Sequence, residues 1–340
     1  MSRTNFPKQF LDILNTGRTL IQSTYDRFAK FIPPEHIYVV TAIAYRDIVV
    51  KQLPDLPDAN ILCEPSRKNT APCVAYISHK LHKLNPNANL ICAPADHLIT
   101  DEEGFMKVCK NALHFTSHIK ALVTLGIKPT YPNTGYGYIQ FDQVKVDDNI
   151  FKVKTFTEKP DHELAKTFVA SGDFLWNAGI FVWQVKNIIR AFEKHLPEMN
   201  EVFEAEKPQF NTKHEQEAID RIYPQCVNIS IDYGVMEKAD NVYIIPASFG
   251  WSDLGTWTSA YDNLEKDYLG NAVAGNNVVV IDATNNMVHA DNKKLLLLQG
   301  LDDFVIVDTK DVLLICKKDK EQEIREYVAE IKRNKGDKYL

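Results

Sequence analysis

The sequence lacks any run of apolar residues long enough to span a bilayer, and Met1 to Leu11 hold no apolar stretch of the kind found in signal peptides. An excess of basic residues is also missing: 39 Lys and Arg stand against 45 Asp and Glu, for a formal net charge of -6 at pH 7. General binding of nucleic acid depends on positive surface charge. We therefore expect a cytoplasmic protein whose partners include neither a membrane nor nucleic acid.

Closely spaced cysteine pairs are absent as well. The six cysteines are scattered along the chain, and no C-x-x-C pair occurs among them. Cysteines at that spacing are the usual ligands of structural zinc, so a zinc site is not expected. In a cytoplasmic protein we predict these cysteines to be reduced and mostly buried, as small hydrophobic residues.

What the chain does have is length and regular alternation. Its 340 residues, 45% of them hydrophobic, suffice for one large α/β domain and a smaller appendage. Short apolar segments alternate with segments of helical period, and the predicted strands include residues 37–41, 59–63, 90–93 and 121–125. This alternation is typical of an α/β fold of Rossmann-like topology with a mixed, mainly parallel sheet. Ligands of such folds bind at the carboxyl ends of strands, and Glu64, Asp96 and Gly126 fall at such ends.

The tail of the chain differs in character. Between residues 275 and 316, short predicted strands are separated by Asn, Asp and Gly turns, and a helix follows them. This spacing suits a small β-rich appendage, either a short β-helix or a curled sheet. We predict an α/β domain over residues 1–265 and a β-rich C-terminal region over residues 266–340. The segment 295–298 is a candidate homodimer interface.

Two loop carboxylates suggest the chemistry. Asp253 lies between two glycines and two tryptophans in the segment 249–257, and Asp96 follows the predicted strand 90–93. Glycines let the backbone approach a ligand closely, and a carboxylate in such a loop suits Mg2+, which bridges to phosphate. With basic residues elsewhere in the chain, this pair indicates metal-assisted phosphoryl or nucleotidyl transfer.

Seven segments then resemble, in order, the motifs of the mannose-1-phosphate guanylyltransferases (GDP-mannose pyrophosphorylases) of the sugar nucleotidyltransferase superfamily. They are Ser2-Arg3 with Pro7-Lys8-Gln9-Phe10, Glu64-Pro65 with Arg67 and Asn69-Thr70-Ala71-Pro72, Pro94-Ala95-Asp96-His97, Thr157-Glu158-Lys159-Pro160, Leu175-Trp176-Asn177-Ala178-Gly179, Ile231-Asp232-Tyr233, and Gly250-Trp251-Ser252-Asp253. The resemblance covers nearly the whole chain, and seven motifs in the family's order form a highly specific match.

The resemblance implies conversion of GTP and mannose 1-phosphate to GDP-mannose and pyrophosphate, with Mg2+ required. The sugar phosphate oxygen would attack the α-phosphorus in line, so catalysis would consist of positioning and charge neutralisation. Asp96 and Asp253 match the family's metal-binding pair, and Lys8 matches the lysine that neutralises the triphosphate. Taken without the family, Lys8 could also be a solvated lysine at a helix start.

Other residues match substrate-binding positions of the family. Lys159 corresponds to the partner of the sugar phosphate, Glu158 and Asn177 to acceptors and donors for mannose hydroxyls, and Gly137 could offer a backbone N–H to the sugar. Judged by local sequence alone, Glu158-Lys159-Pro160 could be only a strand-ending turn. Asp232 either binds the sugar or caps the helix that follows it.

The first third of the chain adds further candidates. Asn69 and Thr70 would lie at a helix N-terminus facing the base or phosphates, where exposed N–H groups favour anions, although a simple helix cap explains them equally well. Arg67 would pair with phosphate or with Glu64. Arg3 and Glu64 are assigned to the substrate by the resemblance alone.

The start of the sequence departs from the family's pattern. Its members open with a strand and a loop of the type G-G-x-G-x-R-x-W-P before the Ser-Arg segment, whereas this sequence begins at Met1-Ser2-Arg3. That loop cradles the nucleotide phosphates with backbone N–H groups. We therefore expect these 340 residues to be weakly active or inactive and poorly stable.

Three interpretations follow. An N-terminally shortened guanylyltransferase is favoured, because the other motifs are intact. The alternatives are a sibling pyrophosphorylase for another sugar phosphate or nucleotide, and a non-catalytic subunit that binds a sugar nucleotide or a partner enzyme.

Overall fold

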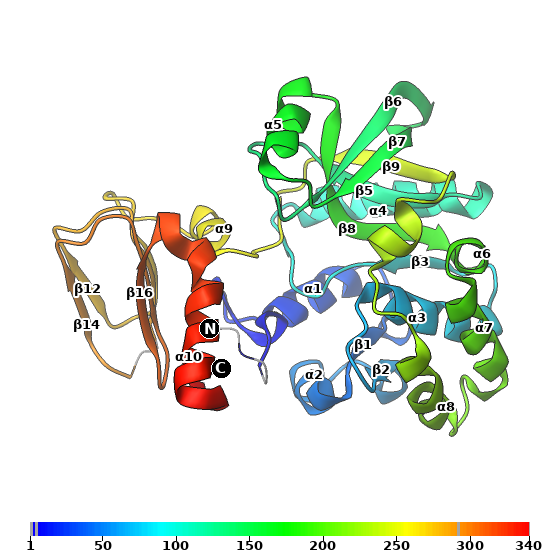
Figure 1. Ribbon diagram of the computed structural model, residues 1–340, viewed down its shortest axis with the longest axis horizontal. Helices are drawn as coiled ribbons and strands as arrows, with labels where there is room; N and C mark the ends of the chain where they lie inside the picture. The colour runs from blue at the N-terminus through cyan, green and yellow to red at the C-terminus, as the bar shows by residue number, and fades with distance from the viewer. Residues whose placement is uncertain (1–2, 4–5, 291–292, 340) are drawn as a thin grey trace. The chain divides into compact units, whose positions relative to one another are not determined.

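The computed structural model describes residue 3, residues 6–290 and residues 293–339, and the chain forms two compact units (Figure 1). The sheet unit consists of residues 27–94 and 99–251, and the terminal unit of residues 1–26, 95–98 and 252–340. Ser2, in the first of the seven segments, lies outside the described residues. The proposed domain boundary after residue 265 stays a prediction.

The sheet unit is built on a six-stranded sheet. Its order is β3 (Asn89–Cys92), β8 (Phe174–Gln184), β5 (Leu122–Ile127), β9 (Val242–Ala247), β7 (Ile150–Glu158) and β6 (Gly137–Asp147). A separate parallel pair joins β1 (Val39–Ala42) to β2 (Ile61–Glu64). The predicted α/β class with a mixed sheet is thus confirmed.

The six-stranded sheet has more antiparallel than parallel strand pairs, whereas the sequence predicted a mainly parallel sheet. β5 pairs in parallel with β9, whereas β8 pairs antiparallel with β3, β5 and β6, and β7 pairs antiparallel with β6 and β9. β3, β5 and β9 do run in one direction, as the strand–helix alternation indicated. The antiparallel ladders arise because β8 lies between β3 and β5, and because β6 and β7 form a hairpin whose turn contains Asn149 at φ 52.

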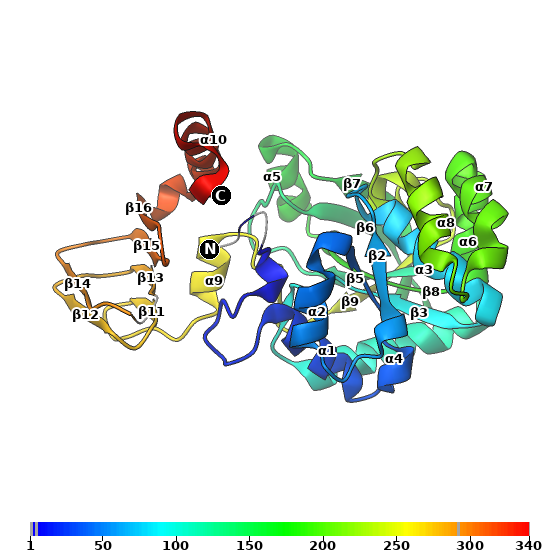
Figure 2. The same ribbon diagram turned by 90° about the horizontal axis from the view of Figure 1, so that it is seen from below.

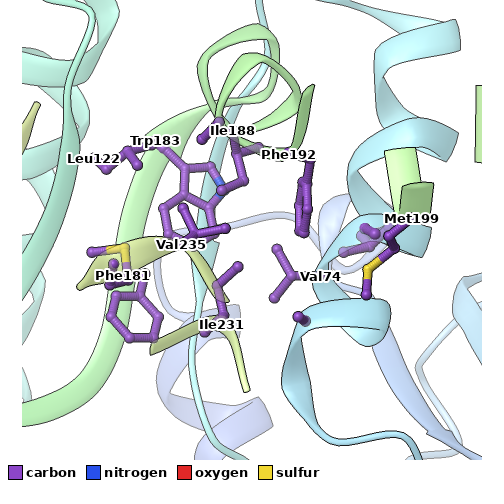
Figure 3. Close-up of a cluster of buried hydrophobic side chains, with 14 of the residues drawn as sticks. Val74, Leu122, Phe181, Trp183, Ile188, Phe192, Met199, Ile231 and Val235 are labelled. Carbon is purple, nitrogen blue, oxygen red and sulfur yellow. The ribbon is translucent and has the colours of Figure 1, made fainter. Parts of the chain in front are cut away.

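Helices cover both faces of this sheet. α4 (Glu102–His118) packs Phe105, Cys109, Ala112 and Phe115 against one face. The other face carries the larger core cluster, to which α3 (Thr70–Leu84), α6 (Val185–His195), α7 (Pro197–Glu206) and α8 (Glu215–Ile222) contribute (Figure 2). Figure 3 shows Val74, Ile188 and Phe192 from these helices in one cluster with Leu122 and Trp183 from the strands. Alternate residues of each strand therefore reach opposite cores.

Further helices and strands precede residue 253. They are α1 (Leu20–Ala29), α2 (Arg46–Gln52), α5 (His162–Ser171), β4 (Leu98–Ile99) and β10 (Trp251–Ser252).

All six cysteines are free, and Cys63, Cys109 and Cys226 are buried. In the part of the chain that the structure describes, no helix has both the length and the apolar character needed to cross a membrane.

The terminal unit contains a β-helix, as one of the two interpretations of the sequence predicted. β11 (Ala272–Ala274), β13 (Met287–His289) and β15 (Phe304–Asp308) stack in parallel, and β12 (Val278–Ile281) pairs in parallel with β14 (Leu296–Gln299). β16 (Leu313–Lys317) runs antiparallel to β15, and the same unit contains α9 (Trp257–Asp262) and α10 (Ile324–Lys335).

A buried asparagine ladder links the coils of this β-helix. The Asn286 Nδ2 donates to Asn271 Oδ1 at 3.0 Å, and each residue is 1% exposed. The Asn271 Nδ2 donates in turn to the Ala283 carbonyl, and Asn286 Oδ1 accepts from the Phe304 N–H. Because each amide is hydrogen-bonded, the ladder can be buried without the penalty of unpaired polar groups.

A buried ion pair ties α3 to α8 in the sheet unit. The Lys80 Nζ lies 2.6 Å from Glu215 Oε2, the Tyr76 hydroxyl donates to Glu215 Oε1 at 2.7 Å, and Lys80 and Glu215 are 7% and 9% exposed. We predict that Lys80→Met lowers the free energy of unfolding by about 3–5 kcal/mol, because it leaves a buried carboxylate without its counter-ion.

Urea unfolding measures this loss. The matched control is Lys194→Met, since Lys194 pairs with Asp240 at an exposed site where both side chains are mostly in solvent. Similar losses in the two variants would contradict the prediction.

Candidate functional site

Three of the predicted site residues meet in the terminal unit. The Lys8 Nζ lies 3.0 Å from Asp96 Oδ2 and donates to the backbone carbonyl of Asp253. Lys8 opens the short 3-10 helix Lys8–Phe10, which is anchored by Phe10 at 2% exposure. The side chain of Lys8 is 22% exposed. Lys8 is therefore a partner of the two aspartates and not a solvated lysine.

The glycine after Asp253 shapes the loop around its carboxylate. The Gly255 N–H donates to Asp253 Oδ1 at 2.9 Å, and a Cβ on Gly255 would lie 2.5 Å from Asp253 Oδ2. Leu254 between them has φ 47 and packs at 4% exposure in a core cluster with Ile13 and Met287. The leucine thus anchors the loop, and the glycine leaves room for the carboxylate.

The acidic pair fits only one type of metal site. Among the described residues, no group of three or more His, Cys, Asp and Glu side chains is placed to hold a metal ion. Lys8 contacts the Asp96 carboxylate and the backbone carbonyl of Asp253, so this loop would supply the Asp96 and Asp253 carboxylates together with one ammonium. Such a set suits Mg2+, which completes its coordination shell with water and substrate phosphates, and does not suit an ion held by protein ligands alone.

A second cluster forms within the sheet unit at the ends of β6, β7 and β8. Gly137 pairs with Glu158 across the β6–β7 ladder, and Lys159 Nζ lies 3.0 Å from Glu158 Oε1. Asn177 Nδ2 donates to Asp232 Oδ1 at 2.8 Å. A Cβ on Gly137 would lie 2.4 Å from Glu158 Oε2 and 3.3 Å from the Asn177 Cβ. The fold therefore brings these five predicted residues together, and Gly137 provides the space for the Glu158 carboxylate.

This second cluster is called the sugar cluster after the role that the sequence predicts for its residues (Gly137, Glu158, Lys159, Asn177 and Asp232). It contains an unsatisfied carboxylate. Glu158 Oε2 is buried, and no hydrogen-bond donor contacts it within the described chain. Burial and the neighbouring Asp232 raise the pKa of Glu158, and Lys159 opposes this rise. Burial also raises the pKa of Asp232. Because a buried acceptor without a donor is costly, the cluster is suited to a ligand that brings a hydroxyl or another donor.

The segment around Asp232 is held by its apolar neighbours. Ile231 and Val235 are 1% and 0% exposed, and Figure 3 shows both in the core beside Phe181. Asp232 begins a π-helical turn, Asp232–Met236, but its side chain accepts from Asn177 and does not cap that turn. Of the two sequence interpretations for Asp232, the helix cap is therefore not observed.

The start of α3 holds the remaining candidates of the sheet unit. Asn69 caps the helix, since its Oδ1 accepts from the Thr70 N–H at 3.0 Å. Thr70 Oγ1 accepts from the Ile231 N–H at 2.9 Å, which joins the helix start to the Asp232 segment. Both residues thus have structural roles; their contact with a nucleotide stays a prediction.

Three other predicted residues have protein partners. The Arg67 guanidinium lies over the Tyr45 ring at 5.1 Å, and the Tyr223 hydroxyl donates to Glu64. Burial raises the pKa of Glu64, and the Tyr223 hydrogen bond opposes this. Arg3 in the terminal unit donates to Asp311 Oδ2 at 2.9 Å. Their assignment to substrate is untested.

Sequence reasoning missed several residues that support the sugar cluster. Thr124 Oγ1 donates to Asn177 Oδ1 at 2.9 Å, and Glu237 Oε1 accepts from the Glu158 N–H at 3.1 Å. For Thr124 a signal existed, since it is a polar residue inside the apolar segment 121–125. Glu237 carried no comparable signal, because its partner lies 79 positions away.

Comparison with known families defines the class of protein. Residues 2–268 match the family model of nucleotidyl transferases, and residues 276–331 match the model of the MannoseP isomerase/GMP-like beta-helix domain. The chain therefore belongs to the nucleotidyl transferase family and is a nucleotidyltransferase with a C-terminal β-helix.

Named relatives narrow this class. The chain is similar to a mannose-1-phosphate guanylyltransferase of Escherichia coli, with 33% identity over 97% of this chain and 72% of the relative. It is also similar to the alginate biosynthesis protein AlgA of Pseudomonas syringae pv. tomato, with 36% identity over 97% of this chain and 68% of the relative. These relatives confirm the resemblance to mannose-1-phosphate guanylyltransferases noted in the sequence.

A solved structure extends the similarity to three dimensions. The crystal structure of mannose-1-phosphate geranyltransferase from Thermus thermophilus matches with a TM-score of 0.87 and 28% identity, over 97% of this chain and 94% of that one. A mannose-6-phosphate isomerase structure from Helicobacter pylori matches with a TM-score of 0.62 and 25% identity, over 74% of this chain and 96% of that one.

The raised pKa of Glu158 predicts a pH dependence of stability. A carboxyl whose pKa rises on folding stabilises the fold below its ordinary pKa of 4.5, and this contribution is lost as the pH rises through the folded value. We expect Glu158→Gln to gain stability relative to the parent chain as the pH rises above 4.5, until Glu158 is ionised in the folded chain as well.

Thermal melts across that pH range measure the difference in Tm. Glu201→Gln, at an exposed position, serves as the control and should show a constant offset from the parent. A pH-independent offset for Glu158→Gln would show that Glu158 titrates alike in the folded and unfolded chain.

Proposed function

We propose that this nucleotidyltransferase transfers a GMP group from GTP to mannose 1-phosphate, releasing pyrophosphate and forming GDP-mannose, with Mg2+ as cofactor. The observation that carries the proposal is the position of the Lys8 ammonium, which contacts the Asp96 carboxylate and the Asp253 backbone carbonyl. These are the residues that the family resemblance assigns to the metal and the triphosphate. The names of the relatives supply the choice of nucleotide and sugar.

Asp96 and Asp253 are the residues that would hold Mg2+, which when bound neutralises phosphate charge and orients the phosphates. Lys8 carries its ammonium on a flexible four-carbon stem, so it can exchange the Asp96 carboxylate for triphosphate oxygens. The Gly255 N–H keeps the Asp253 side chain in place during this exchange. Together these groups offset the negative charge that accumulates on the departing pyrophosphate.

The sugar cluster would bind the second substrate. Glu158 Oε2, which has no donor of its own, would accept a hydrogen bond from a mannose hydroxyl. Asn177 and Asp232 add a donor and an acceptor, and the Gly137 N–H is a further donor in this proposal. The Lys159 side chain is 57% exposed and would pair with the sugar phosphate. The phosphate oxygen is already ionised near pH 7, so its attack on the α-phosphorus needs no general base.

Two further expectations belong to the same proposal. A cytoplasmic location agrees with the free cysteines, because disulfides are rare in that compartment. A homodimer through the C-terminal region agrees with Leu295 and Leu297, each 61% exposed on the β-helix.

The test is pyrophosphate release with GTP, mannose 1-phosphate and Mg2+. It is run on the 340-residue chain and on a chain extended upstream by the codons that precede Met1 in its gene. Release in either form supports the proposal, and omission of each substrate in turn is the control. Release only with another sugar phosphate or nucleotide would show a sibling pyrophosphorylase. Folded protein that binds mannose 1-phosphate or GDP-mannose without turnover in either form would show a non-catalytic subunit.

For the metal pair we predict that Asp96→Asn lowers kcat/KM about a hundredfold or more and raises the Mg2+ concentration needed for half-maximal rate. In this proposal both Mg2+ and Lys8 contact the Asp96 carboxylate, whose negative charge the substitution removes. Steady-state kinetics over a Mg2+ series measure both effects. Asp262→Asn, at an exposed site in the same unit, is the matched control. An unchanged Mg2+ dependence in Asp96→Asn would remove Asp96 from the metal site.

A further inference from the structure

Thr124 places a hydroxyl in the apolar centre of the sheet. It lies on β5, between β8 and β9, and is 0% exposed, as are Leu122, Val123 and Leu125 around it. A hydroxyl buried in such surroundings is costly unless it is hydrogen-bonded. The Thr124 Oγ1 donates to Asn177 Oδ1 at 2.9 Å, with the Ile180 carbonyl at 3.4 Å as a more distant acceptor.

The orientation of the Asn177 amide follows from its donors. Asn177 Oδ1 accepts from the Thr124 hydroxyl and also from the Gly179 N–H, at 3.1 Å. A backbone N–H can only donate, so the atom facing Gly179 must be the amide oxygen. The amide nitrogen therefore faces Asp232, to which it donates at 2.8 Å.

This arrangement leaves Asn177 with donor capacity only. Both acceptor positions of its oxygen are filled within the protein, whereas Nδ2 has a second N–H beyond the one given to Asp232. The nearby Glu158 Oε2 has the opposite property, since it accepts and has no donor. Both residues flank Gly137, since a Cβ built there would meet Glu158 Oε2 and the Asn177 Cβ. A donor beside an acceptor is complementary to a hydroxyl group, which donates and accepts at once.

We propose that Thr124 is a positioning residue of the sugar cluster: its hydroxyl, together with the Gly179 N–H, holds the Asn177 amide oxygen so that an N–H, and not the carbonyl, faces the substrate. The substrate group recognised there is a hydroxyl that donates to Glu158 and accepts from Asn177. This inference rests on the proposed binding of mannose 1-phosphate by the sugar cluster.

Thr124→Val separates this role from a structural one. Valine has the shape of threonine, and Asn177 Oδ1 keeps the Gly179 N–H as a donor, so the substitution leaves no buried atom wholly unpaired. The fold should therefore keep nearly its parental Tm. Thr116→Val is the matched control, since Thr116 is also 0% exposed but donates to the Ala112 carbonyl within α4.

Isothermal titration with mannose 1-phosphate, and with GTP as the second probe, provides the first readout. We expect Thr124→Val to weaken mannose 1-phosphate binding about five- to tenfold, as for loss of one hydrogen bond, with GTP binding unchanged. Thr124→Ser should restore the affinity, and Thr116→Val should bind like the parent. Parental affinity in Thr124→Val, or equal weakening in Thr116→Val, would overturn the inference.

The side-chain amide resonance of Asn177, assigned by its loss in Asn177→Asp, gives a readout without ligand. Its N–H protons should exchange slowly in the parent and in Thr124→Ser, and faster in Thr124→Val. Unchanged exchange in Thr124→Val would refute the positioning role. If the parent binds no mannose 1-phosphate while exchange still responds to Thr124, the proposed function fails and the hydrogen-bond assignment stands.

Discussion

The pairing of β8 with three neighbouring strands is the constraint on which the rest of the sheet unit depends. β8 is buried along almost its whole length and pairs antiparallel with β3, β5 and β6. A strand with backbone partners on both edges and side chains in both cores cannot slip by one residue without moving every side chain into the opposite core, where it does not fit its neighbours. Its register places Asn177 opposite Gly126 and Trp176 opposite Tyr138. The polar groups of the sugar cluster are thus carried by a rigid part of the fold, which is where preorganised binding groups work best.

The charged side chains around Lys8 and those of the sugar cluster differ in their exposure to solvent and in their pairing. In the terminal unit, Lys8 pairs with Asp96, and the side chains are 22% and 30% exposed. Such a pair can exchange partners at low cost, which suits the binding of a charged metal–phosphate group. In the sugar cluster, the Glu158 and Asp232 carboxyls are largely buried with one lysine, and their pKa values are raised. Burial of these carboxyls is unfavourable, and the neutral hydroxyl groups of a ligand can relieve this cost by donating hydrogen bonds.

Much of the fold and of the site could be predicted from the sequence. The segment 121–125 is apolar and short enough to be recognised as β5, and Asn69 with Pro72 marks the start of α3. Lys8, Asp96 and Asp253 were singled out by family motifs, and the structure brings them together. The antiparallel position of β8 between β3 and β5 could not be foreseen. A strand buried on both faces is apolar throughout, and this pattern does not indicate which strands it pairs with. Likewise, Arg3 pairs with Asp311, 308 positions away, and no local pattern links them.

The sequence by itself determined the class of enzyme, the α/β fold with its β-rich tail, and the residues available for chemistry, since these depend on local pattern and on motifs read in order. Only the tertiary structure decided which of those residues have partners and which lack them. Thr124 reaches Asn177 across 53 positions, and Glu158 keeps one oxygen without a donor. Hydrogen bonds of this kind depend on strand register and on the burial that many distant residues produce together, so they appear only once the chain has folded.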